Sequence, residues 1–204
     1  MFAVATSRGW VWEIPDSFID KCIELSQRVE EEYGPECEWG ACLNVKIAER
    51  EIYMFNVVLG QEPRIIRIRC PFQRFMGMIH YHPYNTSFSM TDLIGAMNAI
   101  LRELSRPDIN FVSMLVRKAR GSFYFLDVLV WPDHEHVKNA YRHAREYFSP
   151  MTVREVIETY ELENEEHAYK VLAFYNLSRF PGIRILTWNL TTRYPMPQVR
   201  RLQL

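Results

Sequence analysis

The sequence predicts an α/β (α+β) fold, in which a mixed β-sheet is flanked by helices and followed by a C-terminal helical extension. Three observations lead to this class. Of the 204 residues, 48% are hydrophobic, which suffices for one domain with a sizeable core and an appendage. Runs rich in β-branched and aromatic residues occur in pairs around short polar turns, as in β-hairpins. Between these pairs, apolar residues recur at the spacing of an α-helix.

The N-terminal part of the chain predicts a strand, a helix and a hairpin, in that order. Residues 10–14 form an apolar run that ends at a proline, and a helical pattern continues from there to Tyr33, where Gly-Pro ends it. Residues 38–47 and 51–59 flank a polar turn and predict a hairpin. The Gln-Glu-Pro sequence at 61–63 is expected to end its second strand.

The middle of the chain predicts two further strands and a helix. Arginine alternates with isoleucine within residues 64–69, which predicts a half-buried strand with a basic, solvent-facing side. Residues 76–79 are apolar and lead into a His-Tyr-His run before Pro83, a residue that an inner strand can hardly accommodate. Apolar residues then recur at helical spacing over 93–104.

The last elements of the main domain are a second hairpin and a helix. Residues 109–117 and 123–131 form two strand patterns around a polar turn, and a helical pattern covers approximately residues 133–148. We therefore assign residues 1–148 to one domain.

The remaining residues, 149–204, are expected to form a mainly helical extension. They contain helical patterns at 153–160 and 164–175, and a strand pattern at 183–190. Because so short a segment cannot build a core of its own, we expect it to pack on the main domain or on a protein partner.

Charge and composition narrow the classes of function. The chain has 24 Lys and Arg against 25 Asp and Glu, a net charge of −1, so it has no overall attraction to nucleic acid or anionic membranes. Its N-terminus lacks the pattern of a secretory signal, and no segment approaches the roughly 20 apolar residues of a transmembrane helix. We expect a cytoplasmic protein that binds neither nucleic acid nor membranes.

The four cysteines, Cys22, Cys37, Cys42 and Cys70, contain no Cys-x-x-Cys pair, which argues against a thiolate zinc site. Because disulfides are uncommon in the cytoplasm, we expect all four to be reduced and buried. A second group of candidate metal ligands, the histidines within residues 134–143, lacks the His-Glu-x-x-His spacing and is expected to be solvated.

The strongest candidate site combines His80, His82 and Asp92. Residues two apart on a strand point to the same face, so both imidazoles would lie on one side of the sheet. Asp92, at the start of the next helix, could bring a carboxylate to the same point. Two histidines and one carboxylate are the ligand count of a catalytic zinc whose fourth position stays open to water.

Each part of this pattern also has a simpler explanation. Two histidines at i and i+2 are usually a coincidence of packing, and Ser89-x-x-Asp92 by itself is an ordinary capping box at a helix N-terminus. The combination of His-x-His-Pro with Ser-x-x-Asp a few residues later is far rarer by chance than either part. The combination therefore favours a real metal site.

The sequence His80-x-His82-Pro83 followed by Ser89-x-x-Asp92 resembles the JAMM (MPN-type) zinc metalloproteases. The resemblance covers approximately residues 1–148 and implies an MPN-type sheet and Zn²⁺ as the cofactor. It departs from the family's usual pattern in two ways, because six rather than seven residues separate His82 from Ser89 and Tyr81 stands between the histidines.

The resemblance also implies the catalytic residues. Glu38 follows the first helix, three residues before a small residue, and so occupies the position of the family's general acid/base. Ser89 would assist the developing oxyanion. The implied activity is hydrolysis of the isopeptide bond between the C-terminus of a ubiquitin-like protein and a lysine, with ubiquitin-like proteins or their conjugates as partners.

Two other functions are compatible with the pattern. One is a catalytically silent MPN-type scaffold that joins a larger assembly, for instance through residues 149–204. The other is a metal-dependent amidase that acts on a small molecule. Residues 64–69 and the loop 84–88 are candidate walls of a substrate groove beside the metal.

Overall fold

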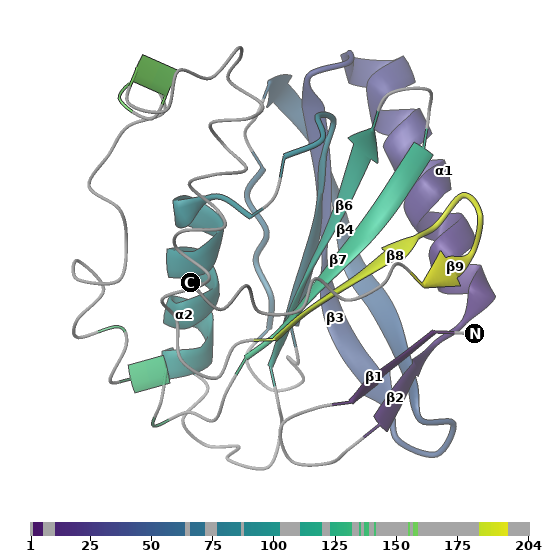
Figure 1. The fold of residues 1–204 in the computed structure, drawn as a ribbon, viewed down its shortest axis with the longest axis vertical. Coiled ribbons are helices and arrows are strands. Elements are labelled where there is room, and N and C mark those ends of the chain that lie inside the picture. Colours follow the sequence, from purple (N-terminus) through teal and green to yellow (C-terminus); the bar gives the residue numbers. More distant parts are fainter. Residues whose placement is uncertain are drawn as a thin grey trace.

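The computed structural model shows a mixed sheet with a helix on either face (Figure 1). It describes residues 2–5, 11–63, 66–71, 77–86, 88–102, 111–119, 123–131, 135, 137–138, 141, 155, 157–158 and 184–195. The helices are α1 (Asp16–Tyr33) and α2 (Met90–Arg102). The strands are β1 (Phe2–Ala5), β2 (Val11–Ile14), β3 (Cys37–Lys46), β4 (Glu51–Pro63), β5 (Gly77–His82), β6 (Val112–Ala119), β7 (Phe123–Val130), β8 (Arg184–Asn189) and β9 (Tyr194–Pro195).

The described strands form a nine-stranded sheet in the order β1-β2-β4-β3-β5-β6-β7-β8-β9. Strand β5 lies near its centre, antiparallel to β3 and parallel to β6. In this register Gly40 of β3 and Leu115 of β6 flank His80. The histidine strand is therefore hydrogen-bonded on both sides, which holds its side-chain directions firmly.

Helices α1 and α2 cover opposite faces of the sheet, and each face has its own core (Figure 1). The α1 core includes Ile79 and Tyr81 of β5, together with Trp39. The core on the other face includes Leu93 and Met97 of α2. Because side chains alternate between the two faces along β5, its odd-numbered residues lie in the α1 core and its two histidines lie on the α2 side.

Most of the predicted elements of the main domain are confirmed. The helix ending at Tyr33, the hairpin that begins near residue 38, the histidine strand, the helix before residue 104 and the hairpin of β6 and β7 are all present. The mixed α and β class is confirmed as well. Strand β1 was not predicted.

Two predictions around residue 60 are wrong. Strand β4 does not end before the Gln-Glu-Pro sequence but continues to Pro63, which pairs with Cys37. On the side away from β3, strand β4 pairs with β2 at Glu51, and no described strand pairs with Pro63 there, so the proline lies at an edge position, where sheets tolerate it. The following segment is not a strand, because residues 66–70 pair with no described strand.

Residues 66–70 cross the face of the sheet instead. A Cβ on Gly40 would lie 2.3 Å from Cδ1 of Ile68, so Ile68 sits directly over this glycine. Arg67 and Arg69 are exposed while Ile66, Ile68 and Cys70 are partly buried, so the predicted alternation is present. Paired residues of antiparallel strands share a face, so Ile68 lies on the same side of the sheet as His80.

The prediction that all four cysteines are reduced is wrong for one pair. Cys42 and Cys70 form a disulfide, with their Cα atoms 5.6 Å apart. The two cysteines are 28 positions apart in the sequence, and no local pattern predicted their proximity, which arises because the 66–70 segment folds back over β3. Cys22 and Cys37 are free and buried, as predicted, and burial raises the pKa of the Cys22 thiol.

The C-terminal extension contributes to the main sheet. The predicted strand is β8, and all six of its residues pair with β7. Three described positions in the predicted helix 153–160 are helical, whereas the predicted helix 164–175 lies outside the described residues. The division into domains at residue 148 stays a prediction.

Neither α1 nor α2 is both long and apolar enough to cross a membrane, nor is any other helix among the described residues.

Candidate metal centre

The two histidines of the centre come from the end of β5. The strand places His80 and His82 on the face opposite the α1 core, and it ends at His82, directly before Pro83. Their ring centroids are 4.8 Å apart. The predicted common face of the two imidazoles is therefore confirmed.

Asp92 reaches the histidines because a capping box fixes the start of α2. The backbone N–H of Asp92 donates to Oγ of Ser89 at 3.2 Å, and the backbone N–H of Ser89 donates to Oδ2 of Asp92 at 2.6 Å. These reciprocal bonds satisfy two helix N-terminal donors. Asp92 can therefore cap the helix and also lie near the histidines, because the same carboxylate that accepts the Ser89 N–H faces the imidazoles.

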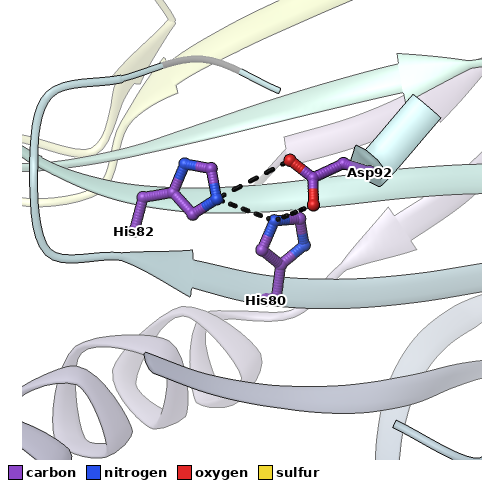
Figure 2. A group of neighbouring side chains, drawn as sticks. All are labelled: His80, His82 and Asp92. Carbon is purple, nitrogen blue, oxygen red and sulfur yellow. Dashed lines mark hydrogen bonds and ion pairs between the residues drawn. The ribbon is translucent and has the colours of Figure 1, made fainter. Parts of the chain in front are cut away.

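The three side chains converge on one point (Figure 2). The Nε2 atoms of His80 and His82 are 3.1 Å apart, and they lie 3.2 Å and 3.7 Å from the nearer carboxylate oxygens of Asp92. With metal–ligand bonds of about 2.0–2.1 Å, neighbouring ligand atoms of a tetrahedral zinc are about 3.3 Å apart. The two histidine nitrogens therefore have the spacing of two tetrahedral ligands. With one ligand atom from each residue, the three lie within 4.8 Å of one another, so the group could hold a metal ion.

The electrostatics of the three groups differ. Burial and the positive charge of His80 lower the pKa of His82 from its ordinary 6.5 to about 4. Burial also opposes the charged forms of His80 and Asp92, but their mutual attraction outweighs it. The pKa of His80 is therefore raised and that of Asp92 lowered. Near neutral pH, His82 is neutral and can offer a nitrogen lone pair to a metal ion.

Thr86 is a contact that the sequence analysis missed. Its Oγ1 lies 3.0 Å from Nδ1 of His82. When Nδ1–H donates to this oxygen, the neutral ring carries its lone pair on Nε2, the nitrogen that faces Asp92 and His80. The available signal was a hydroxyl residue four positions after the second histidine, in the turn that follows Pro83.

A partly buried ion pair holds the loop that carries Thr86. Nε of Arg117 donates to Asp127 at 2.6 Å, and another guanidinium nitrogen donates to the side-chain oxygen of Asn85. The guanidinium also lies over the ring of Phe125, 4.6 Å from its centre. This anchor depends on β6 and β7, so local sequence patterns could not reveal it.

Glu38 lies on β3, two residues before the glycine that pairs with His80, and only 9% of it is exposed. Its negative charge contributes to the raised pKa of His80, so the carboxylate is electrostatically coupled to the centre. Ser89 is bonded to Asp92 as described. The structure thus associates both predicted catalytic residues with the histidines and Asp92, and their catalytic roles stay predictions.

Tyr81 faces away from the centre, as the strand alternation predicted. Its hydroxyl donates to Glu30 of α1, and Glu30 also pairs with Lys118. Burial and this hydrogen bond raise the pKa of Tyr81. The tyrosine between the histidines therefore belongs to the α1 side of the sheet.

The histidines near residue 140 lie outside the described residues, and Glu135 in that region is exposed.

A cleft of about 690 Å³ adjoins the centre. Residues 66–70 form one wall and α2 the other, and His80 and Asp92 lie on its lining. The disulfide to Cys42 and the contact of Ile68 with Gly40 hold the first wall in place. Of the two predicted groove walls, the 64–69 segment supplies four lining residues, 66–69, and the 84–88 loop supplies Phe88.

Comparison of the chain with protein-family models and with curated proteins gives no match.

Proposed function

We propose that this protein is a zinc-dependent metalloprotease of the JAMM (MPN) type. Its reaction would be hydrolysis of the isopeptide bond between the C-terminus of a ubiquitin-like protein and a lysine. The observation that carries the proposal is the convergence of His80, His82 and Asp92, whose ligand atoms lie within 4.8 Å of one another, close enough to hold a metal ion. The chain order of the helix, the Glu38 strand, the histidine strand and the capped helix agrees with the resemblance drawn from the motif.

The donor set fits Zn²⁺ better than a hard cation. Two imidazole nitrogens and one carboxylate suit zinc, whereas Mg²⁺ and Ca²⁺ prefer oxygen ligands. Because the three described donors leave one tetrahedral position for water, they are typical of a catalytic rather than a structural site. When bound, zinc would lower the pKa of its water to about 7 and polarise the scissile carbonyl.

Glu38 and Ser89 would supply the remaining chemistry. In this proposal, the Glu38 carboxylate takes the proton of the attacking water and delivers it to the leaving lysine nitrogen. The Ser89 Oγ accepts a hydrogen bond from the Asp92 backbone, so its own hydrogen can be donated to the developing oxyanion. Amide hydrolysis suits this arrangement, because expulsion of an amine requires a positioned acid.

A small-molecule amidase is the second candidate, because the cleft is of the size that small-molecule sites commonly have. A silent scaffold is less well supported. A silent scaffold would require neither three ligand groups nor the hydrogen bonds with Thr86 and Ser89 that orient them.

The test combines metal content with cleavage of defined substrates. Wild-type protein purified with zinc present should contain one zinc per chain and cleave ubiquitin-like conjugates. Asp92→Asn should lose zinc. Glu38→Gln should keep zinc but cleave about 10²- to 10⁴-fold more slowly, because it lacks the proton carrier.

Glu49→Gln is the matched control, because it makes the same chemical change in the exposed turn between β3 and β4. It should keep both zinc and activity. A wild-type protein that takes up no zinc would refute the metalloenzyme. Zinc binding with cleavage of small amides alone would favour the amidase, and zinc binding without any cleavage would favour the scaffold.

A further inference from the structure

The cleft beside the metal centre has a marked charge asymmetry. Three arginines lie on its lining, Arg67 and Arg69 from the crossing segment and Arg102 from the end of α2. Asp92 is the only acidic residue among the described lining residues. Its charge is already engaged with the two histidines.

The three guanidinium groups are available to a ligand. All three residues are exposed, and no described residue forms an ion pair with their side chains. Other exposed cations have partners, for example Lys21 with Glu24 and Arg28 with Glu32. Positive charge that has no ion-pair partner among the described residues thus gathers on the walls of the cleft beside the centre.

The spacing of two of these arginines suits an extended peptide. Arg67 and Arg69 are the exposed residues of a segment whose alternate residues are partly buried, as in an extended chain. Residues two apart in such a chain are separated by about 6.6 Å. Acidic side chains two apart in an extended ligand repeat at the same distance.

We infer that the cleft selects an amide substrate whose peptide segment next to the scissile bond carries acidic side chains. The inference rests on the proposed hydrolase, and it adds a substrate class that the metal-binding motif does not specify. Arg67 and Arg69 would bind the acidic side chains from one wall, and Arg102 would attract them from the other. These arginines act on substrate selection, while the proton transfers stay with Glu38.

Binding of three labelled peptides tests the inference without requiring cleavage. The probes are fluorescein-labelled hexapeptides that end in Gly-Gly and carry two aspartates, two serines or two lysines at alternate positions. Their affinities for zinc-treated Glu38→Gln protein are measured by fluorescence anisotropy. We expect the aspartate probe to bind about fourfold more tightly than the serine probe, since each of the two exposed ion pairs contributes about twofold. The lysine probe should bind most weakly, and high salt should reduce all these differences.

Two double variants locate the source of the preference. Arg67→Gln/Arg69→Gln should bind the aspartate and serine probes nearly equally. Lys21→Gln/Arg28→Gln removes the same charge from exposed positions on α1, on the opposite face of the sheet, and should keep the wild-type preference. Equal thermal unfolding temperatures of the two variants would show that both are folded.

The outcomes separate this inference from the proposed function. Equal binding of the aspartate and serine probes would overturn the inference, even in a protein that binds zinc and cleaves conjugates. A preference that persists without Arg67 and Arg69 would also overturn it, because the carboxylates would then bind elsewhere. If N-acetyl-aspartate amide bound as tightly as the aspartate probe, the cleft would recognise a small anionic amide rather than a peptide, which would also overturn the inference. Absence of zinc and of all cleavage would refute the hydrolase, while a preference that depends on Arg67 and Arg69 would still support a binding site for acidic peptides.

Discussion

Removal of the Cys42–Cys70 disulfide should destabilise the protein by about 3.6 kcal/mol. The bond joins residues 28 apart in sequence. In the chain-entropy description, closing a loop of that length lowers the entropy of the unfolded chain by about 12 cal/mol/K, which corresponds to this free energy at 25 °C. Cys42→Ala/Cys70→Ala is the suitable variant, because alanine leaves no hydroxyl group in the buried position of Cys42.

Urea denaturation measures the effect. If the unfolding free energy falls by about 2 kcal/mol per molar urea, the midpoint should decrease by about 1.8 M. The reduced wild-type protein should unfold at nearly the same urea concentration as the double variant. Zinc affinity should change little, because the metal ligands come from β5 and α2, whereas the disulfide holds the 66–70 wall of the cleft.

Cys22→Ala/Cys37→Ala is the control, because it removes the two free cysteines. This protein should still lose stability when a reductant is added. A wild-type midpoint that is identical in oxidising and reducing buffer would refute the reasoning, since the bond would then constrain neither the unfolded chain nor the fold.

Three further predictions concern the centre and its support. Thr86→Val should weaken zinc binding about 10- to 100-fold in a chelator competition, whereas Thr86→Ser should bind as wild type, because the bond to His82 Nδ1 orients the ring. Because folding lowers the pKa of His82 from 6.5 to about 4, the unfolded chain binds the proton more readily, so His82 should cost the metal-free protein about 3 kcal/mol between pH 7 and pH 4 relative to the His82→Asn variant. Urea midpoints across this range check the loss, and an equally steep loss in His82→Asn would contradict the assignment. Gly77→Ala should destabilise by about 3 kcal/mol in the same assay, because its Cβ would lie 2.0 Å from the Val112 carbonyl oxygen. Wild-type stability in this variant would show that the strand shifts at no cost.

The parts of the centre that local patterns predicted are those with local causes. The pleat of a strand places His80 and His82 on one face whatever the rest of the chain does. A capping box similarly fixes Asp92 relative to Ser89, because both residues belong to the same turn. Short spacings therefore predicted the candidate ligands and the helix start that brings the third ligand near.

The contacts that support the centre come from distant parts of the chain and were not predicted. Asn85 is held by Arg117, which is 32 residues away, and Arg117 is held in turn by Asp127 of the next strand. The β5–β6 pairing places Arg117 beside His82. No periodicity within a segment records which strand becomes its neighbour.

The sequence by itself determined the periodic elements, the two-histidine face and the capped aspartate, because strand pleat and helix capping act over a few residues. Only the tertiary structure decided that residues 66–70 leave the sheet, cross over Gly40 and bond through Cys70 to Cys42. The alternation of arginine and isoleucine shows which side of that segment is buried but not what it is buried against. Packing of the segment on the face of β3 therefore turned a predicted strand into a wall of the cleft, with its arginines exposed beside the centre.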